Sequence, residues 1–180
     1  MSDTPAVAAF RRMLSIPGLP PSDPHPSADP AQARERFAQL HALDADIAEP
    51  TQAKLFEPDG PARATVVLWH GFTNAPSQFA AVAEAMADQG FRVLLPRMPF
   101  HGESDVLNRD LGGLTVNQLI NHADAWMDVA AGFPEPVWVG GLSAGATLAA
   151  WVAATRPRVT RLVMAAPLIA PKAAPMPLVR

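Results

Sequence analysis

The stretch Gly141–Gly145, which reads Gly-Leu-Ser-Ala-Gly, decides the fold, because a different element is expected on each side of it. Before it, residues 136–140 read Pro-Val-Trp-Val-Gly, which is short and apolar, as in a buried strand. After it, residues 146–154 are apolar and alanine-rich, which favours a helix. A Gly-x-Ser-x-Gly at such a junction predicts a sharp turn, whose glycines let strand and helix approach without a Cβ clash. The turn strains the serine backbone and lifts the Ser143 hydroxyl out of the sheet.

The composition predicts one globular domain and excludes several kinds of function. The 180 residues are 49% hydrophobic and 17% charged, so a sizeable core is expected. The formal net charge of -3 gives no electrostatic reason to expect nucleic acid or an anionic membrane as a partner. The absence of cysteine excludes disulfides, thiolate metal sites and cysteine nucleophiles. No run reaches the roughly 18 apolar residues of a membrane span, and no secretory signal is recognised, so we expect a cytoplasmic protein.

Apolar strands alternate with helical patterns along most of the chain. Short apolar runs predict strands over residues 51–56, 64–69, 91–95, 137–140 and 160–164. Helical spacing predicts helices over residues 31–43, 77–89, 115–131 and 146–154. This alternation is typical of an α/β fold with a mostly parallel sheet and helices on both faces. Residues 1–50 are expected to form a proline-rich lead segment and a helix, and residues 51–180 the core.

Two further motifs follow predicted strands. His70-Gly71-Phe72 comes after the strand over 64–69, and His101-Gly102-Glu103-Ser104 comes after the strand over 91–95. With Gly-x-Ser-x-Gly third in order, the chain resembles the α/β-hydrolase family. It is most similar to the esterase, monoacylglycerol lipase and serine aminopeptidase-like members. The resemblance covers residues 54–170.

The resemblance implies an enzyme that cleaves a carboxylic ester, or a related acyl bond, through an acyl-serine intermediate. Ser143 would be the nucleophile between the glycines Gly141 and Gly145. The backbone N–H groups of Phe72 and Ala144 would bind the oxyanion. The resemblance implies a small acyl substrate as the partner. It implies no cofactor and no metal. The same motifs occur in acyltransferases, thioesterases and peptidases, and a degenerate member would be a non-catalytic binding module.

The chain departs from the family after the serine. The family supplies the acid and the histidine of its triad there, but residues 144–180 contain no Asp, Glu or His. We therefore expect the N-terminal portion of a longer hydrolase, which ends near the start of the lid and is nearly inactive alone. The fold would be incomplete at its C-terminal side. The strand over 160–164 would then be an exposed apolar edge, through which we expect self-association.

The histidines before the serine are interpreted as structural. His70 and His101 are expected to be loop residues that form local hydrogen bonds, because the base of this family follows the serine. We consider His101 paired with Asp105 as an internal replacement for the missing base, but the spacing of the two residues does not support this role. His122 is expected on the surface of its helix.

The remaining charged residues are also interpreted as structural. Asp124 and Asp128 lie on the polar side of a predicted helix and are expected to be solvated. The arginines around Pro157, at 156, 158 and 161, are expected to form a solvated connection between a helix and a strand. No histidine and acidic spacing typical of a metal site is present.

Overall fold

A five-stranded sheet is the centre of the molecule in the computed structural model, which describes residues 21–102 and 110–168. Its strands have the order β1-β3-β2-β4-β5. Their bounds are β1 Lys54–Phe56, β2 Thr65–Trp69, β3 Arg92–Leu95, β4 Val137–Leu142 and β5 Val159–Ala165. Strands β3, β2, β4 and β5 are parallel, and β1 pairs antiparallel with β3. The expected α/β class with a mostly parallel sheet is confirmed.

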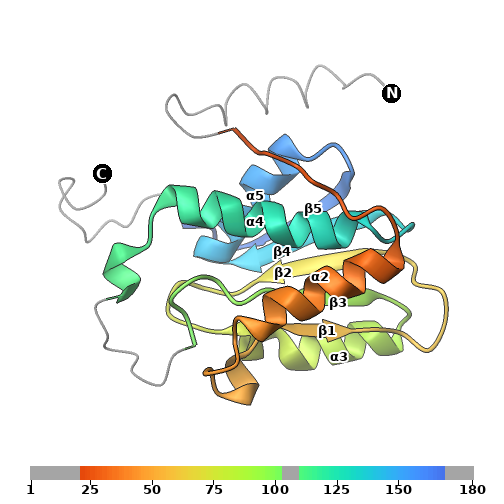
Figure 1. The fold of residues 1–180 in the computed structure, drawn as a ribbon, viewed down its shortest axis with the longest axis horizontal. Coiled ribbons are helices and arrows are strands. Elements are labelled where there is room, and N and C mark those ends of the chain that lie inside the picture. The colour runs from red at the N-terminus through yellow and green to blue at the C-terminus, as the bar shows by residue number, and fades with distance from the viewer. Residues whose placement is uncertain (1–20, 103–109, 169–180) are drawn as a thin grey trace.

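Helices cover both faces of this sheet (Figure 1). Three of them share one hydrophobic core on one face: α2 Pro30–Ala42, α4 Val116–Ala131 and α5 Ala144–Thr155. Helix α3, Ala80–Asp88, packs on the other face. The single turns η1 Glu49–Thr51, η2 Pro76–Phe79 and η3 Asp110–Gly113 lie in the connections. Among the described helices, none combines the length and the hydropathy needed to cross a membrane.

The alternation of apolar side chains between the two faces of each strand explains why helices lie on both sides of the sheet. In β2, Val66 faces the core beneath α3, whereas Val67 and Trp69 face the core beneath α2, α4 and α5. Successive side chains of a strand point to opposite faces, so a strand that is apolar throughout needs cover on both. Two of the helices, α2 and α4, begin at a residue whose side chain caps the helix. Thr115 and Gln118, for example, form a capping box at the start of α4.

The lead segment is attached to α4 by two buried carboxylates. Asp124 Oδ2 accepts the Asp23 N–H at 2.8 Å, and Asp128 Oδ2 accepts the His25 N–H at 2.9 Å. Both carboxylates also pair with the buried Arg156, at 2.6 and 3.4 Å. The expectation that Asp124 and Asp128 are solvated is therefore wrong. Their charges are buried because a guanidinium and two backbone N–H groups replace water.

The other two arginines of the same connection also make specific contacts. Arg158 donates to the carbonyl oxygens of Ala131 and Phe133. The Arg161 guanidinium lies over the Trp138 ring, with its central carbon 4.7 Å from the ring centroid. Arg158 and Arg161 are nevertheless exposed, as expected of a solvated connection, and the expectation is wrong only for the buried Arg156.

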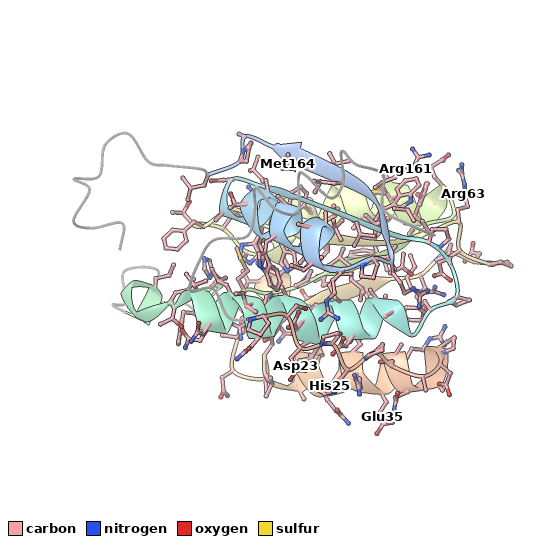
Figure 2. The ribbon with its side chains drawn as sticks, turned by 90° about the horizontal axis from the view of Figure 1, so that it is seen from above. Asp23, His25, Glu35, Arg63, Arg161 and Met164 are labelled. Carbon is pink, nitrogen blue, oxygen red and sulfur yellow. The ribbon has the colours of Figure 1, made fainter. Side chains whose placement is uncertain are left out.

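Strand β5 is an edge of the described sheet, since its strand partner there is β4. The side chains of Val163 and Met164 follow each other along β5, so they point to opposite faces, and the two residues are 67% and 45% exposed. Figure 2 shows Met164 and Arg161 along one side of the molecule, away from Asp23 and His25. An edge strand with exposed apolar side chains on both faces is suited to pair with another strand.

We predict that the 180-residue chain self-associates through β5. Val163→Lys should weaken the association about tenfold, because a charge on an edge strand opposes strand pairing. Sedimentation velocity over a concentration series measures the effect. Val82→Lys is the matched control, since Val82 is 50% exposed but lies on α3. A monomer at all concentrations for the unaltered chain would contradict the prediction.

Candidate active site

Ser143 occupies the junction between β4 and α5. Strand β4 ends at Leu142, and α5 begins at Ala144. The backbone of Ser143 has φ of 54° and ψ of -117°, a combination that residues with a side chain rarely adopt. Such strain persists only where the surrounding structure determines the backbone strongly, and it is frequent at functional sites.

The two glycines of the turn lie where no larger residue fits. A Cβ added to Gly145 would lie 2.1 Å from the Trp69 carbonyl oxygen, and one added to Gly141 would lie 2.5 Å from the Gly145 carbonyl carbon. The end of β2 and the first turn of α5 therefore approach each other at backbone contact distance. Ser143 is enclosed between these two positions, which accounts for its sharp turn.

The last residue of β5 and the segment after it hold the backbone of Ser143. Its N–H donates to the Ala165 carbonyl at 2.9 Å, and its carbonyl accepts the Leu168 N–H at 3.1 Å. The Thr147 hydroxyl donates to the Leu168 carbonyl at 2.8 Å and so links this segment to α5. The N–H of Ala144 is the first of α5, where backbone N–H groups have no intrahelical partner and the helix dipole is positive. An anion beside Ser143 would be stabilised there.

The loop after β2 passes beside Ser143. A Cβ built on Gly71 would lie 3.8 Å from the Ser143 Cβ, and Phe72, the next residue, is 41% exposed. The Gly71 N–H donates to Gln78 Oε1 at 2.8 Å, and the Asn74 N–H closes a turn onto the Gly71 carbonyl at 3.0 Å. Gly71 thus lies beside Ser143, and Phe72 is the next residue along this loop.

His70 is a fully buried loop residue with both ring nitrogens engaged by the backbone. Its Nδ1 lies 2.9 Å from the Gly71 carbonyl oxygen, and its Nε2 accepts the Met98 N–H at 3.1 Å. This arrangement fixes the neutral tautomer that carries hydrogen on Nδ1. Burial lowers the pKa of His70 to about 3, and the neighbouring positive charge of Arg97 acts in the same direction.

His101 also directs both ring nitrogens at backbone groups. Its Nδ1 lies 2.8 Å from the Pro99 carbonyl oxygen, and its Nε2 lies 2.6 Å from the Phe72 carbonyl oxygen. The rings of His70 and His101 meet edge to face, with centroids 5.0 Å apart. Neither histidine is arranged as a base for a serine, as expected of structural residues, but their hydrogen bonds are not only local, since His70 contacts Met98 and His101 contacts Phe72, 28 and 29 positions away. Asp105, which we weighed as a partner of His101, lies outside the described residues.

Two polar side chains near this region differ from the sequence analysis. His122 lies elsewhere than expected, and the role of Gln78 was not predicted. His122 is half-buried rather than on the helix surface; its Nε2 is buried without a hydrogen-bond partner in the described part of the chain, and burial lowers its pKa to about 3. Gln78 carries the loop contact at Gly71, although no pattern around it signals that role. Within residues 21–102 and 110–168, no three His, Asp or Glu side chains gather as they would around a metal ion.

We predict that Gly145→Ala destabilises the fold by about 3 kcal/mol, because the new methyl group overlaps the Trp69 carbonyl oxygen. Urea denaturation measures the change in the free energy of unfolding. The matched control is Gly60→Ala, where nothing lies within 4 Å of the added Cβ, and its expected effect is within about 0.5 kcal/mol. Equal stability of the two variants would contradict the close approach of β2 and α5.

Acid should destabilise the fold through His70. Its pKa is about 3 when folded, against an ordinary histidine value of 6.5, so the unfolded chain binds the proton first as the pH falls. The stabilisation from neutral His70 is therefore complete above about pH 6.5 and decreases toward about pH 3. Between pH 7.5 and pH 5.0 its share of the loss should be about 2 kcal/mol. Urea denaturation at both pH values checks this, and His70→Asn, which cannot titrate, should lose correspondingly less.

Two proteins with similar sequences are named as a lipase and a phospholipase. A thermostable monoacylglycerol lipase of Bacillus sp. (strain H-257) is 31% identical over 101 residues, which is 54% of this chain and 38% of that protein. The phospholipase YtpA of Bacillus subtilis (strain 168) is 28% identical over 109 residues, which is 59% of this chain and 41% of that protein. The matched regions thus span about two fifths of the length of these relatives.

The fold and the family agree with these relatives. The crystal structure of a probable hydrolytic enzyme from Pseudomonas aeruginosa PAO1 has a TM-score of 0.50 and 19% identity to this chain, and the match covers 65% of this chain and 36% of that one. Residues 60–180, more than half of the chain, match the family described as Serine aminopeptidase, S33. The protein therefore belongs to this serine aminopeptidase family of α/β-hydrolases.

Proposed function

We propose that this protein is a serine hydrolase that cleaves a carboxylic ester, with Ser143 as its nucleophile. The observation that carries the proposal is the backbone of Ser143, at φ of 54° between β4 and the start of α5, beside Gly71. A serine in this position presents its hydroxyl outside the sheet at the positive end of a helix. The membership of a serine hydrolase family supports the same interpretation.

The proposed reaction has two steps. The Ser143 Oγ attacks the carbonyl carbon of the ester, and the electron pair of the C=O bond moves to oxygen. The N–H groups of Phe72 and Ala144 bind this oxyanion, and each such donor contributes about 3 kcal/mol to transition-state stabilisation. Collapse of the intermediate expels the alcohol, and water then hydrolyses the acyl-serine to the acid and free Ser143.

A base is needed to take the proton of the serine. His70 and His101 hold backbone groups with both ring nitrogens, so we assign the role to neither. The family carries its histidine and acid after the serine, and residues 144–180 contain no His, Asp or Glu. We therefore propose that these 180 residues alone hydrolyse esters slowly, since losing triad members typically costs several orders of magnitude in rate.

The proposed substrate is an ester with an apolar acyl group. The names of the monoacylglycerol lipase and phospholipase relatives support this class. So does the exposed Phe72, an apolar side chain that directly follows Gly71, the residue beside Ser143. The second candidate is cleavage of an amide at a peptide N-terminus, which the description of the family as serine aminopeptidases favours.

We predict that a fluorophosphonate probe labels Ser143 in the protein expressed from its natural reading frame, because only an activated serine reacts readily. Intact-mass analysis should find one adduct, and Ser143→Ala should remove it. Ser77→Ala is the matched control and should still be labelled, since Ser77 is an exposed serine in η2. No labelling of the unaltered protein would favour a binding module over an enzyme.

A substrate panel separates the two candidate reactions. With p-nitrophenyl butyrate, a butyryl thioester and an aminoacyl p-nitroanilide, we expect kcat/KM to be at least about tenfold higher for the ester. A preference for the anilide would contradict the ester assignment and favour the aminopeptidase.

A further inference from the structure

The backbone of Gly71 and Phe72 is held at three of its four polar groups. The Gly71 N–H donates to Gln78 Oε1 at 2.8 Å. The Gly71 carbonyl accepts from His70 Nδ1 at 2.9 Å, and the Phe72 carbonyl faces His101 Nε2 at 2.6 Å. The fourth group is the Phe72 N–H, which is the proposed oxyanion donor. The contacts thus surround the one group that the reaction would use.

His101 can make both of its contacts only as an imidazolium. Its Nδ1 is 2.8 Å from the Pro99 carbonyl oxygen, and its Nε2 is 2.6 Å from the Phe72 carbonyl oxygen. Carbonyl oxygens accept hydrogen bonds and cannot donate them, whereas a neutral imidazole has one N–H and one bare nitrogen. A neutral ring would therefore place a lone pair against one of the two oxygens. A protonated ring donates to both, and charge-assisted bonds are short, as the 2.6 Å contact is.

The surroundings of His101 include further charged and titratable groups. Arg97 Nη1 donates to the His101 carbonyl at 2.8 Å, and Arg97 Nε pairs with Asp44 Oδ1 at 2.7 Å. Asp44 thus compensates the positive charge of Arg97. The pKa of both His70 and His122 is lowered to about 3 by burial, so these two rings are neutral at pH 7. The groups that directly face the two ring nitrogens of His101 are the carbonyl oxygens of Pro99 and Phe72.

We propose that His101, protonated on both ring nitrogens, is a positioning residue that holds Phe72 in the orientation needed to bind the oxyanion. The inference rests on the proposed function. The peptide group that joins Gly71 to Phe72 is planar, so the His70 contact at its carbonyl sets the direction of the Phe72 N–H. The His101 contact fixes the next peptide group and closes the loop onto the segment after β3. A donor held in place before the reaction stabilises the transition state without reorganisation.

Two substitutions of His101 separate positioning from general packing. The amide nitrogen of Gln can replace Nε2 and still donate to the Phe72 carbonyl, whereas that of Asn can replace Nδ1 and donate only to the Pro99 carbonyl. In the protein expressed from its natural reading frame, His101→Asn should lower kcat for p-nitrophenyl butyrate about thirtyfold with KM within about twofold. His101→Gln should stay within about threefold of the unaltered kcat.

The control for these measurements is His25→Gln, because the His25 side chain is 72% exposed, and its kcat should not change. Equal kcat values for the Asn and Gln variants would overturn the positioning role. Thermal melting of each variant identifies any loss of the fold. If both variants unfold, the imidazole spectrum of the unaltered protein decides between the outcomes.

The protonation of His101 can be measured independently of enzymatic activity. In a 15N spectrum of the imidazole rings at pH 7, both His101 nitrogens should carry slowly exchanging hydrogens, and they should do so in Ser143→Ala as well. A bare nitrogen on His101 would overturn the proposal and leave the proposed function intact. Conversely, absence of ester hydrolysis by the unaltered protein, with both nitrogens protonated, would overturn the proposed function and the oxyanion role of the loop.

Discussion

The approach of the Trp69 carbonyl to Gly145 is the constraint on which the site depends. Strand β2 pairs with β4 so that Trp69 lies opposite Gly141. Helix α5 begins directly after β4, and its first turn contacts the backbone at the end of β2. No Cβ fits at this crossing, and the serine between the two glycines absorbs the bend in its own backbone. The core on the α5 face then holds the helix against the sheet and maintains the contact.

The loop after β2 is held in place by hydrogen bonds, in addition to the steric constraint at Gly145. Two buried histidines and a glutamine hold the carbonyl and amide groups of Gly71 and Phe72 beside the serine. The histidines differ in their partners, because His70 contacts an N–H and a carbonyl whereas His101 contacts two carbonyls. Two His-Gly motifs that look alike in sequence therefore make different contributions to the same loop.

The sheet and its helices could be predicted from the sequence because their signals are local. Apolar runs and helical spacing locate β2, β3, β4 and β5 to within a few residues, and the glycines around Ser143 indicate the turn. The pairing of Asp124 with Arg156 could not be predicted, because two residues 32 positions apart meet only after α4 and α5 have packed. The partial burial of His122 depends in the same way on distant elements, whereas the Gln78 contact spans only seven positions and was missed because no pattern marks it.

The hydrogen bonds around Ser143 have a mechanical consequence. Both peptide groups of the serine are tied to the chain that leaves the edge strand, through Ala165 on one side and Leu168 on the other. Any force that pulls Leu168 outward is therefore transmitted across a single bond to the strained residue itself. The backbone geometry of Ser143 therefore depends on the course of the chain at the end of β5 as well as on its own glycines.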